Sequence, residues 1–281
     1  MENPANSVRS KDPPRRGGRF LWREVAAWLA AAPGLGVLVA WAAVVAQEYF
    51  APLILFPVLV GVGLGALAVG LIRIVPLGNR LTAVLGTILA ASVAIGGQHY
   101  FSYITAVEAT DQQDDMLRIV RRAFPDLVGQ RMADSPRSVF DFLHKQADAG
   151  RPIGAAGRRL QGGWVWASWG FDGLLVLSAA LAMVVPAVWL PYCDRCRSWY
   201  RVIRSGRIPG RAAVRLASLV DLEMDPPPRG VHYRLLACVG GCGPTAFELS
   251  WEAAAGDTLA ARMWLGPADR DRATAALDEE V

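Results

Sequence analysis

The sequence predicts a mainly α protein, in which a four-helix transmembrane bundle carries a small helical extracytoplasmic segment and a small α+β cytoplasmic domain. Three observations support this prediction. Hydrophobic residues make up 53% of the 281 residues, which is more than a soluble domain of this size normally contains. Four stretches are long and apolar enough to cross a bilayer. All four cysteines lie behind the last of these stretches, in the final third of the chain.

Each apolar stretch reaches the roughly 20 residues that a helix needs to cross the hydrocarbon core. We place the spans at residues 25–46, 51–72, 81–104 and 170–192. The first span is longer than the apolar core of a cleaved signal peptide, so we expect it to remain as an anchor.

The basic residues indicate which ends of the spans face the cytoplasm. Residues 1–24 contain six Lys and Arg residues, residues 195–215 contain seven arginines, and the turn at 73–80 adds two more. Both termini and this turn are therefore expected in the cytoplasm, and residues 105–169 on the opposite side. Because 27 of the 29 basic residues are arginine, a bias typical of GC-rich bacteria, the expected location is a bacterial inner membrane.

The segment 105–169 is too polar to insert and contains two helical patterns. Residues 107–123 predict an amphipathic helix that either stands alone or prolongs the third span. Ser135 followed by Pro136 is typical of a helix start, and Gly150 of its end. Two short helices bury little area, so we expect them to pack on the membrane surface or on a partner.

The cysteines form two close pairs, Cys193-x2-Cys196 and Cys238-x3-Cys242. Such spacings let one tight turn supply two ligands, and a tetrahedral zinc ion takes four. In a reducing compartment, paired spacings favour a metal over disulfides. We therefore predict a structural zinc ion bound by all four cysteines.

The second pair lies within "VHYRLLACVGGCGPTAFELSW", which predicts a strand, a glycine-rich turn and a second strand. On this pattern, residues 193–252 resemble a zinc ribbon, a structural class that implies no enzymatic activity. Two features depart from that class. The second spacing is three residues instead of two, and a predicted helix at 209–223 lies between the pairs.

Other interpretations of the cysteines remain open. Cys193 and Cys196 could form a redox pair, although the sequence lacks the βαβ setting in which such pairs normally occur. An iron site would accept the same four thiolates. If the domain were outside the cytoplasm, disulfides would be the better interpretation.

Each of the three histidines has a plain structural interpretation. His99 lies near the outer end of the third span, where we expect an interfacial, hydrogen-bonded side chain in preference to a haem ligand or proton relay. We expect His144 to be a solvated helix residue. His232, six positions before Cys238, is a possible substitute metal ligand, but we expect it to face solvent on a strand.

Two further patterns concern partners and packing. Arginines at helical spacing after the fourth span could bind anionic lipid, although topology alone would also place them there; they are Arg197, Arg201, Arg204 and Arg207. No recognition motif favours nucleic acid. The Gly61-x3-Gly65 pattern predicts close helix contacts, within the bundle or between chains.

The chain as a whole resembles bacterial four-span membrane proteins with a zinc-ribbon-like C-terminal domain, a resemblance that implies no activity. We expect a scaffold or interaction protein for an unidentified cytoplasmic partner and not an enzyme, because paired carboxylates and nucleophile–base pairs are missing from the sequence. The alternatives are a small transporter or channel subunit, or a membrane thiol-redox protein using Cys193 and Cys196. Residues 253–281 are expected to be a solvated tail.

Overall fold

The structure is a computed structural model that describes residues 22–49, 54–75, 77–123, 136–153, 158–218, 230–252 and 258–280. It divides into two compact units, which we describe separately. The helical unit contains residues 22–75 and 81–186, and the C-terminal unit contains residues 187–281 together with the turn 77–80. The N-terminal residues 1–21, where most of the predicted basic tail lies, are outside the described residues.

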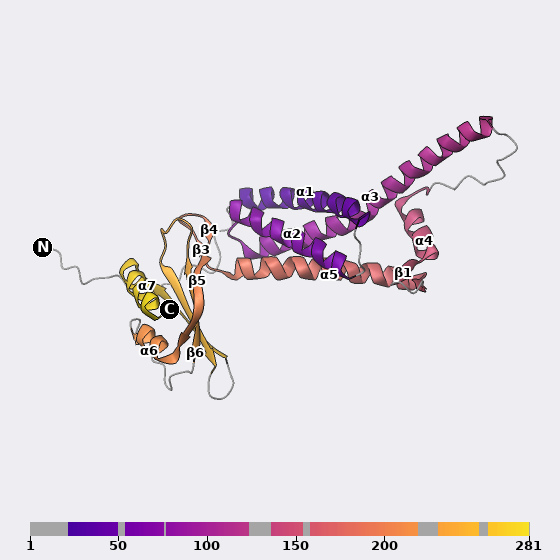
Figure 1. Ribbon diagram of the computed structural model, residues 1–281. Coiled ribbons are helices and arrows are strands. Elements are labelled where there is room, and N and C mark those ends of the chain that lie inside the picture. Colours follow the sequence, from indigo (N-terminus) through magenta and orange to yellow (C-terminus); the bar gives the residue numbers. More distant parts are fainter. Residues whose placement is uncertain are drawn as a thin grey trace. The chain divides into compact units, whose positions relative to one another are not determined.

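Among the described residues, four helices are long and apolar enough to cross a membrane. They are α1 (Trp22–Gln47), α2 (Leu55–Ile74), α3 (Arg80–Ala123) and α5 (Gly163–Trp189), and they lie side by side in Figure 1. The four predicted apolar segments therefore lie on helices, although α5 ends at Trp189, before the predicted end of the fourth span at 192, and residues 51–53 are outside the described residues. The predicted helix at 107–123 is the continuation of α3, which is a single helix of 44 residues.

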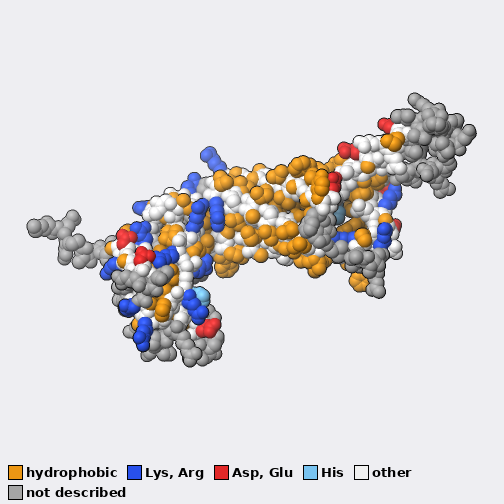
Figure 2. All heavy atoms as spheres, in the orientation of Figure 1, with side chains coloured by type: hydrophobic (Ala, Val, Ile, Leu, Met, Phe, Trp, Pro, Cys, Tyr) orange, Lys and Arg blue, Asp and Glu red, His pale blue; other side chains and the backbone are white. Residues whose placement is uncertain are grey.

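The long helices expose many hydrophobic side chains. Figure 2 shows hydrophobic side chains over the exposed surfaces of the long helices. The exposed residues include Leu38, Leu59, Leu85 and Leu174, one from each helix. A water-soluble protein rarely exposes so large an apolar surface, whereas a lipid-facing surface requires it.

Glycines set the closest contacts inside the helical unit. A Cβ atom added to Gly65 would lie 2.8 Å from the Cβ of Met183 in α5, and one added to Gly61 would meet the backbone of Val176. Both sites of the Gly61-x3-Gly65 pattern therefore pack within the bundle, which was one of the two predicted uses. Gly36 makes the corresponding contact between α1 and the carbonyl oxygen of Ala90 in α3.

The segment between α3 and α5 differs from the prediction. One helix, α4 (Val139–Ala149), is followed by an unpredicted hairpin of β1 (Arg151–Ile153) and β2 (Arg158–Leu160). Ser138 caps α4, because its hydroxyl accepts a hydrogen bond from the Asp141 amide at 3.2 Å. The predicted start at Ser135 and Pro136 was thus too early, and Ser135 itself lies outside the described residues.

The C-terminal unit contains a small antiparallel sheet domain. Its four main strands are neighbours in sequence order, and a short separate hairpin precedes them. The strands are β3 (Tyr192–Cys193), β4 (Ser198–Trp199), β5 (Arg201–Pro209), β6 (Gly230–Ala237), β7 (Thr245–Glu252) and β8 (Thr258–Leu265). The predicted pair of strands around Cys238 and Cys242 is confirmed as β6 and β7.

Two helices cover one face of this sheet, α6 (Gly210–Ser218) and α7 (Pro267–Glu280). Leu216 and Leu277 from these helices pack with sheet residues such as Leu235, Phe247 and Leu249 in one buried cluster. Residues 258–280 therefore belong to the domain, which contradicts the predicted solvated tail over this part; residues 253–257 and 281 of that prediction lie outside the described residues. α7 contributes Ala273 and Leu277 to the buried cluster.

The region between the cysteine pairs also differs from the prediction. Residues 201–209 are a strand, β5, although their arginines recur at helical spacing. The predicted helix at 209–223 is confirmed over Gly210–Ser218, and residues 219–223 lie outside the described part of the chain. Pairing of β5 with β6 decides its conformation, since eight residues of β5 have partners in β6.

Candidate metal centre

Two hairpins supply the four cysteines. In the first hairpin, Cys193 ends β3 and pairs with Ser198 of β4, and Cys196 lies in the turn between them. In the second, Cys238 follows β6 and Cys242 precedes β7. The two hairpins come from segments separated by 41 residues, so the domain fold has to bring them together.

Glycines shape the second turn. Gly241 has a φ of +60°, a conformation that residues with a Cβ rarely adopt, and its N–H donates to the Cys238 carbonyl oxygen at 3.1 Å. A Cβ on Gly240 would lie 3.3 Å from the Cβ of Cys196, and one on Gly243 would lie 2.6 Å from the Tyr200 hydroxyl. The turn therefore approaches the first hairpin closely because it lacks side chains at these positions.

The four sulfur atoms form one cluster. All four Sγ atoms lie within 4.8 Å of one another; Cys193 and Cys242 are 3.5 Å apart, and Cys238 and Cys242 are 3.7 Å apart. A tetrahedral ion with metal–sulfur bonds of about 2.3 Å separates its sulfur ligands by about 3.8 Å. A disulfide would need sulfur atoms about 2.05 Å apart, and all four cysteines are free. The cluster could therefore hold a metal ion without large movement.

Two of the four cysteines are buried in a small apolar cluster of the C-terminal domain. Cys193 and Cys238 are buried, and they pack with Tyr200, Leu236 and Ala246. The Tyr200 hydroxyl donates to the carbonyl oxygen of Pro244 at 2.8 Å, which holds the second turn against the first hairpin. The amide of Gly243 donates to the Cys238 sulfur at 3.3 Å. Hydrogen bonds of this kind stabilise a thiolate and orient it toward a metal.

The thiols differ in pKa. At Cys196, burial acts to raise the pKa, but hydrogen bonds with Ser198 and Cys193 lower it to about 6. Burial raises the pKa of Cys193, and burial together with hydrogen bonds to the neighbouring thiols raises the pKa of Cys242 to about 12. Four thiolates at these distances repel one another, so a bound cation is needed to keep all four deprotonated.

The first hairpin also contacts the turn between α2 and α3. The indole nitrogen of Trp199 donates to the carbonyl oxygen of Leu77, and the Trp199 ring packs edge-on against Tyr192 at 5.1 Å. The same turn also contacts the end of α5, since the guanidinium of Arg80 donates to the carbonyl oxygens of Trp189 and Leu190 at 3.3 and 3.4 Å. Sequence reasoning missed these contacts, because residues 77–80 carry no motif.

The remaining predicted residues lie apart from the cluster. His232 is exposed on β6, opposite Arg207 and Ser250, and the group of potential metal ligands found in the described residues consists of the four cysteines. His144 is exposed on α4, as predicted, and its ring packs edge-on against Trp166 with ring centres 5.5 Å apart. His99 packs edge-on against Trp169 and lines a cavity of the helical unit, and the hydrogen bond predicted for it is not found among the described residues.

The four arginines do not follow one helical face. Arg201, Arg204 and Arg207 lie on β5, where a bulge between Val202 and Arg204 interrupts the alternation. Arg204 pairs with Asp278 of α7 at 2.5 Å, while Arg197, Arg201 and Arg207 are exposed. Binding of anionic lipid by these arginines stays a prediction. Arg204 is the least available of the four, because it already forms an ion pair with Asp278.

Comparisons of the chain with protein-family models, with curated proteins and with solved structures give no match.

Proposed function

We propose that this chain is an integral protein of a bacterial inner membrane, whose C-terminal domain folds around one structural zinc ion and serves as a cytoplasmic interaction scaffold without catalytic activity. The observation that carries the proposal is the cluster of Cys193, Cys196, Cys238 and Cys242, whose sulfur atoms all lie within 4.8 Å of one another. A site with four thiolate ligands is closed to substrate, and closed zinc sites contribute folding energy instead of catalysis.

The membrane part of the proposal rests on the four apolar helices and on the positions of the arginines. The positive-inside rule assigns the turn 77–80 and the C-terminal domain to the same side, the cytoplasm. The hydrogen bond between Trp199 and Leu77 agrees with this assignment, because it joins these two segments. A reducing cytoplasm would keep the four thiols available to a metal.

The zinc-ribbon part of the proposal rests on two turns that each supply two cysteines, as in a zinc ribbon. The domain departs from that class in its three-residue second spacing, in the helix α6 between the pairs, and in the added β8 and α7. We therefore assign a zinc-ribbon-like site within a larger α+β domain. Cys238 and Cys193 are buried in it, so the metal would tie the end of α5 to the main sheet.

The face of the sheet opposite α6 and α7 is the surface that we assign to a partner. Arg234, Glu248 and Arg262 lie in register across β6, β7 and β8, with Arg207 and His232 beside them. The carboxylate of Glu248 forms ion pairs with both neighbouring arginines, which leaves this surface with a net positive charge. The complementary partner is an acidic protein segment.

The metal content of the purified full chain tests the proposal. We expect one zinc ion per chain by elemental analysis, and none when all four cysteines are replaced by serine. Ser250→Ala, on the sheet away from the cluster, is the control and should keep its zinc. Bound iron in place of zinc, or four thiols that react freely in the metal-free folded protein, would overturn the assignment of structural zinc.

The partner surface has its own test. A photoreactive amino acid at position 232 should crosslink to a cytoplasmic protein in cells, and Arg234→Glu combined with Arg262→Glu should abolish that crosslink. The same amino acid at Ala275, exposed on α7 on the other side of the sheet, should give none. Equal crosslinking at both positions, or none at position 232, contradicts the assigned surface.

A further inference from the structure

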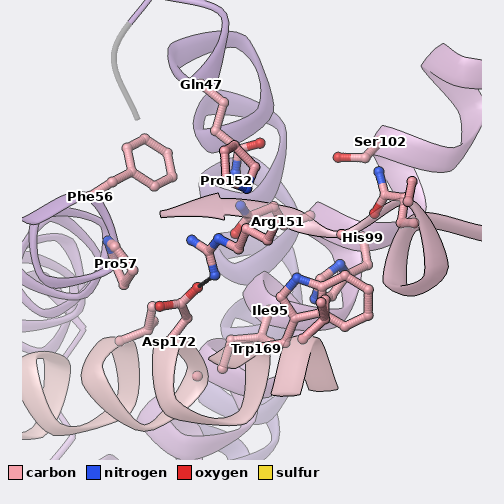
Figure 3. Close-up of a pocket in the computed structure, with 17 residues that line it drawn as sticks. Gln47, Phe56, Pro57, Ile95, His99, Ser102, Arg151, Pro152, Trp169 and Asp172 are labelled. Atoms are coloured by element: carbon pink, nitrogen blue, oxygen red, sulfur yellow. Dashed lines mark hydrogen bonds and ion pairs between the residues drawn. The ribbon is translucent and has the colours of Figure 1, made fainter. Parts of the chain in front are cut away.

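A cavity of about 450 Å³ opens among the long helices at the end of the helical unit where α4 and β1 lie. Figure 3 shows its labelled side chains converging from α1, α2, α3, α5 and the β1 strand. Phe56, Ile95 and Val176 give it apolar walls, and Arg151 and Asp172 bring opposite charges to it. Its volume lies within the range of small-molecule sites, which combine apolar walls with a few convergent polar groups.

The charged residues form an ion pair across the cavity wall. Nη1 of Arg151 lies 2.5 Å from Oδ2 of Asp172, and the two side chains are 25% and 23% exposed. The same nitrogen donates to the Ser168 hydroxyl at 3.3 Å. Both of these contacts involve Nη1, and no hydrogen bond of Nε or Nη2 of Arg151 is found among the described residues.

Other polar side chains line the cavity without hydrogen-bond partners among the described residues. Gln47, Gln98 and His99 come from α1 and α3, and His99 contacts the Trp169 ring edge-on at 5.2 Å. Packing alone would favour apolar residues at the end of an apolar bundle, because unpartnered polar groups and partly buried ion pairs do not by themselves stabilise a fold. The ionisable residues His99 and Asp172 lie near the ends of the predicted spans, and ionisable residues in such segments are candidates for a functional site.

The balance of charge restricts the ligand. A simple anion that binds Arg151 would also face the carboxylate of Asp172, and a simple cation would face the guanidinium. A zwitterion satisfies both, since its anionic group can accept from Nε and Nη2 of Arg151 while its ammonium group donates to Asp172. Gln47 and Gln98 can then bind the remaining polar atoms of the ligand.

The tryptophans around the cavity favour a lipid as the source of this zwitterion. Trp164 and Trp166 are exposed near Trp169 at the start of α5, and such tryptophans mark the depth of lipid headgroups. We propose that the cavity binds a zwitterionic amine–phosphate group, supplied by the headgroup of an ethanolamine phospholipid. This inference depends on the proposed membrane insertion, but it does not depend on the zinc ion.

The test uses the full chain in a detergent micelle, with tryptophan fluorescence as the readout because Trp169 lines the cavity. The probes are short-chain phosphatidylethanolamine, short-chain phosphatidylglycerol and free O-phosphoethanolamine. We expect the ethanolamine lipid to bind at least tenfold more tightly than the glycerol lipid. Equal affinity for these two lipids would overturn the proposal. If free O-phosphoethanolamine binds as tightly as the lipid, the zwitterion is retained and the lipid is excluded as its source.

Two kinds of variant assign the binding to this cavity. Arg151→Gln and Asp172→Asn should each weaken binding of the ethanolamine lipid at least tenfold. Lys145→Gln should not, because the Lys145 ammonium pairs with Asp141 on α4 and the residue does not line the cavity. Gly173 and Ile95 both line the cavity, and a Cβ added at Gly173 would meet Ile95 at 3.4 Å, so we expect Gly173→Leu to occupy cavity space while it keeps both charged side chains. Unchanged binding in Gly173→Leu would refute the site even if the charge variants fail to fold.

The zinc and membrane proposals can fail separately from this one. Replacement of all four cysteines should leave binding of the ethanolamine lipid unchanged, since the cavity lies in the other compact unit. Insertion of the chain into the membrane is measured independently, by its resistance to carbonate extraction.

Discussion

The indole nitrogen of Trp199 donates a hydrogen bond to the backbone carbonyl oxygen of Leu77, at 2.9 Å and across 122 positions of the chain. Both residues are buried. Trp199 is in β4 of the first cysteine hairpin, and Leu77 is in the turn that joins α2 to α3. The candidate metal centre is therefore attached to the connection between two apolar helices, in addition to its covalent link through α5.

Trp199→Phe tests this attachment. The substitution leaves the Leu77 carbonyl oxygen buried without a donor, which should lower the free energy of unfolding of the C-terminal unit by about 1–3 kcal/mol. Thermal unfolding of the full chain in detergent measures the change. Trp164→Phe is the matched control; this tryptophan is 73% exposed, so we expect little change. Equal stability of both variants would show that the hydrogen bond adds nothing.

Gly61→Ala tests the contact between α2 and α5. The added methyl group would overlap the Val176 carbonyl oxygen and lie 2.8 Å from the Cβ of Ala179, so the helices must separate. We expect a loss of about 1–3 kcal/mol, typical of overpacking, measured by unfolding in mixed micelles. Gly63→Ala, on the same helix with open space around it, should be neutral or stabilising by up to about 1 kcal/mol. A stable Gly61→Ala variant would mean that the helices are not in close contact there.

Leu277→Ala tests whether α7 belongs to the domain core. Leu277 is fully buried, so truncation should destabilise the C-terminal unit by about 2–5 kcal/mol. Asp278→Asn is the control from the next position. Its carboxylate is 64% exposed in the pair with Arg204, and such pairs contribute at most about 1 kcal/mol. If protease cuts at 267–280 as fast in the wild type as in Leu277→Ala, α7 is not docked.

Acidification should release the proposed metal. Zinc binds thiolates, so protons compete with it at all four cysteines, and the apparent affinity must fall as the pH falls. We expect a coloured zinc chelator to remove the ion far more readily at pH 5.5 than at pH 7.5. The domain should lose stability in parallel, because the binding energy of a structural zinc is folding energy. A thermal midpoint that is the same with and without chelator would contradict a structural metal.

The local features of the fold could be predicted from the sequence. The four apolar segments are long enough to identify without knowledge of their packing, and the alternation around Cys238 and Cys242 predicted two strands with a glycine-rich turn. Both predictions depend on properties of neighbouring residues. The four cysteines could be predicted as metal ligands for the same reason, because each pair is recognised from the spacing of two nearby residues.

The errors have a common origin in contacts between distant segments. Arg201, Arg204 and Arg207 recur at helical spacing, but pairing with β6 makes 201–209 a strand. Residues 267–280 looked like a tail because they contain few large apolar residues, yet Ala273 and Leu277 are buried against the sheet. The hairpin after α4 was missed because three-residue strands carry almost no signal of their own.

The sequence by itself determined the number of apolar helices, the turns at the cysteines and the identity of the four thiols, because hydrophobic length and turn chemistry act over a few neighbouring residues. The tertiary structure alone decided that two cysteine pairs separated by 41 residues form one cluster, and that Arg151 meets Asp172 at a cavity. Contacts of this kind depend on which distant segments pack together. Which segments pack together depends on how apolar side chains are buried and how strands pair across the whole chain, and no single stretch of the sequence determines it.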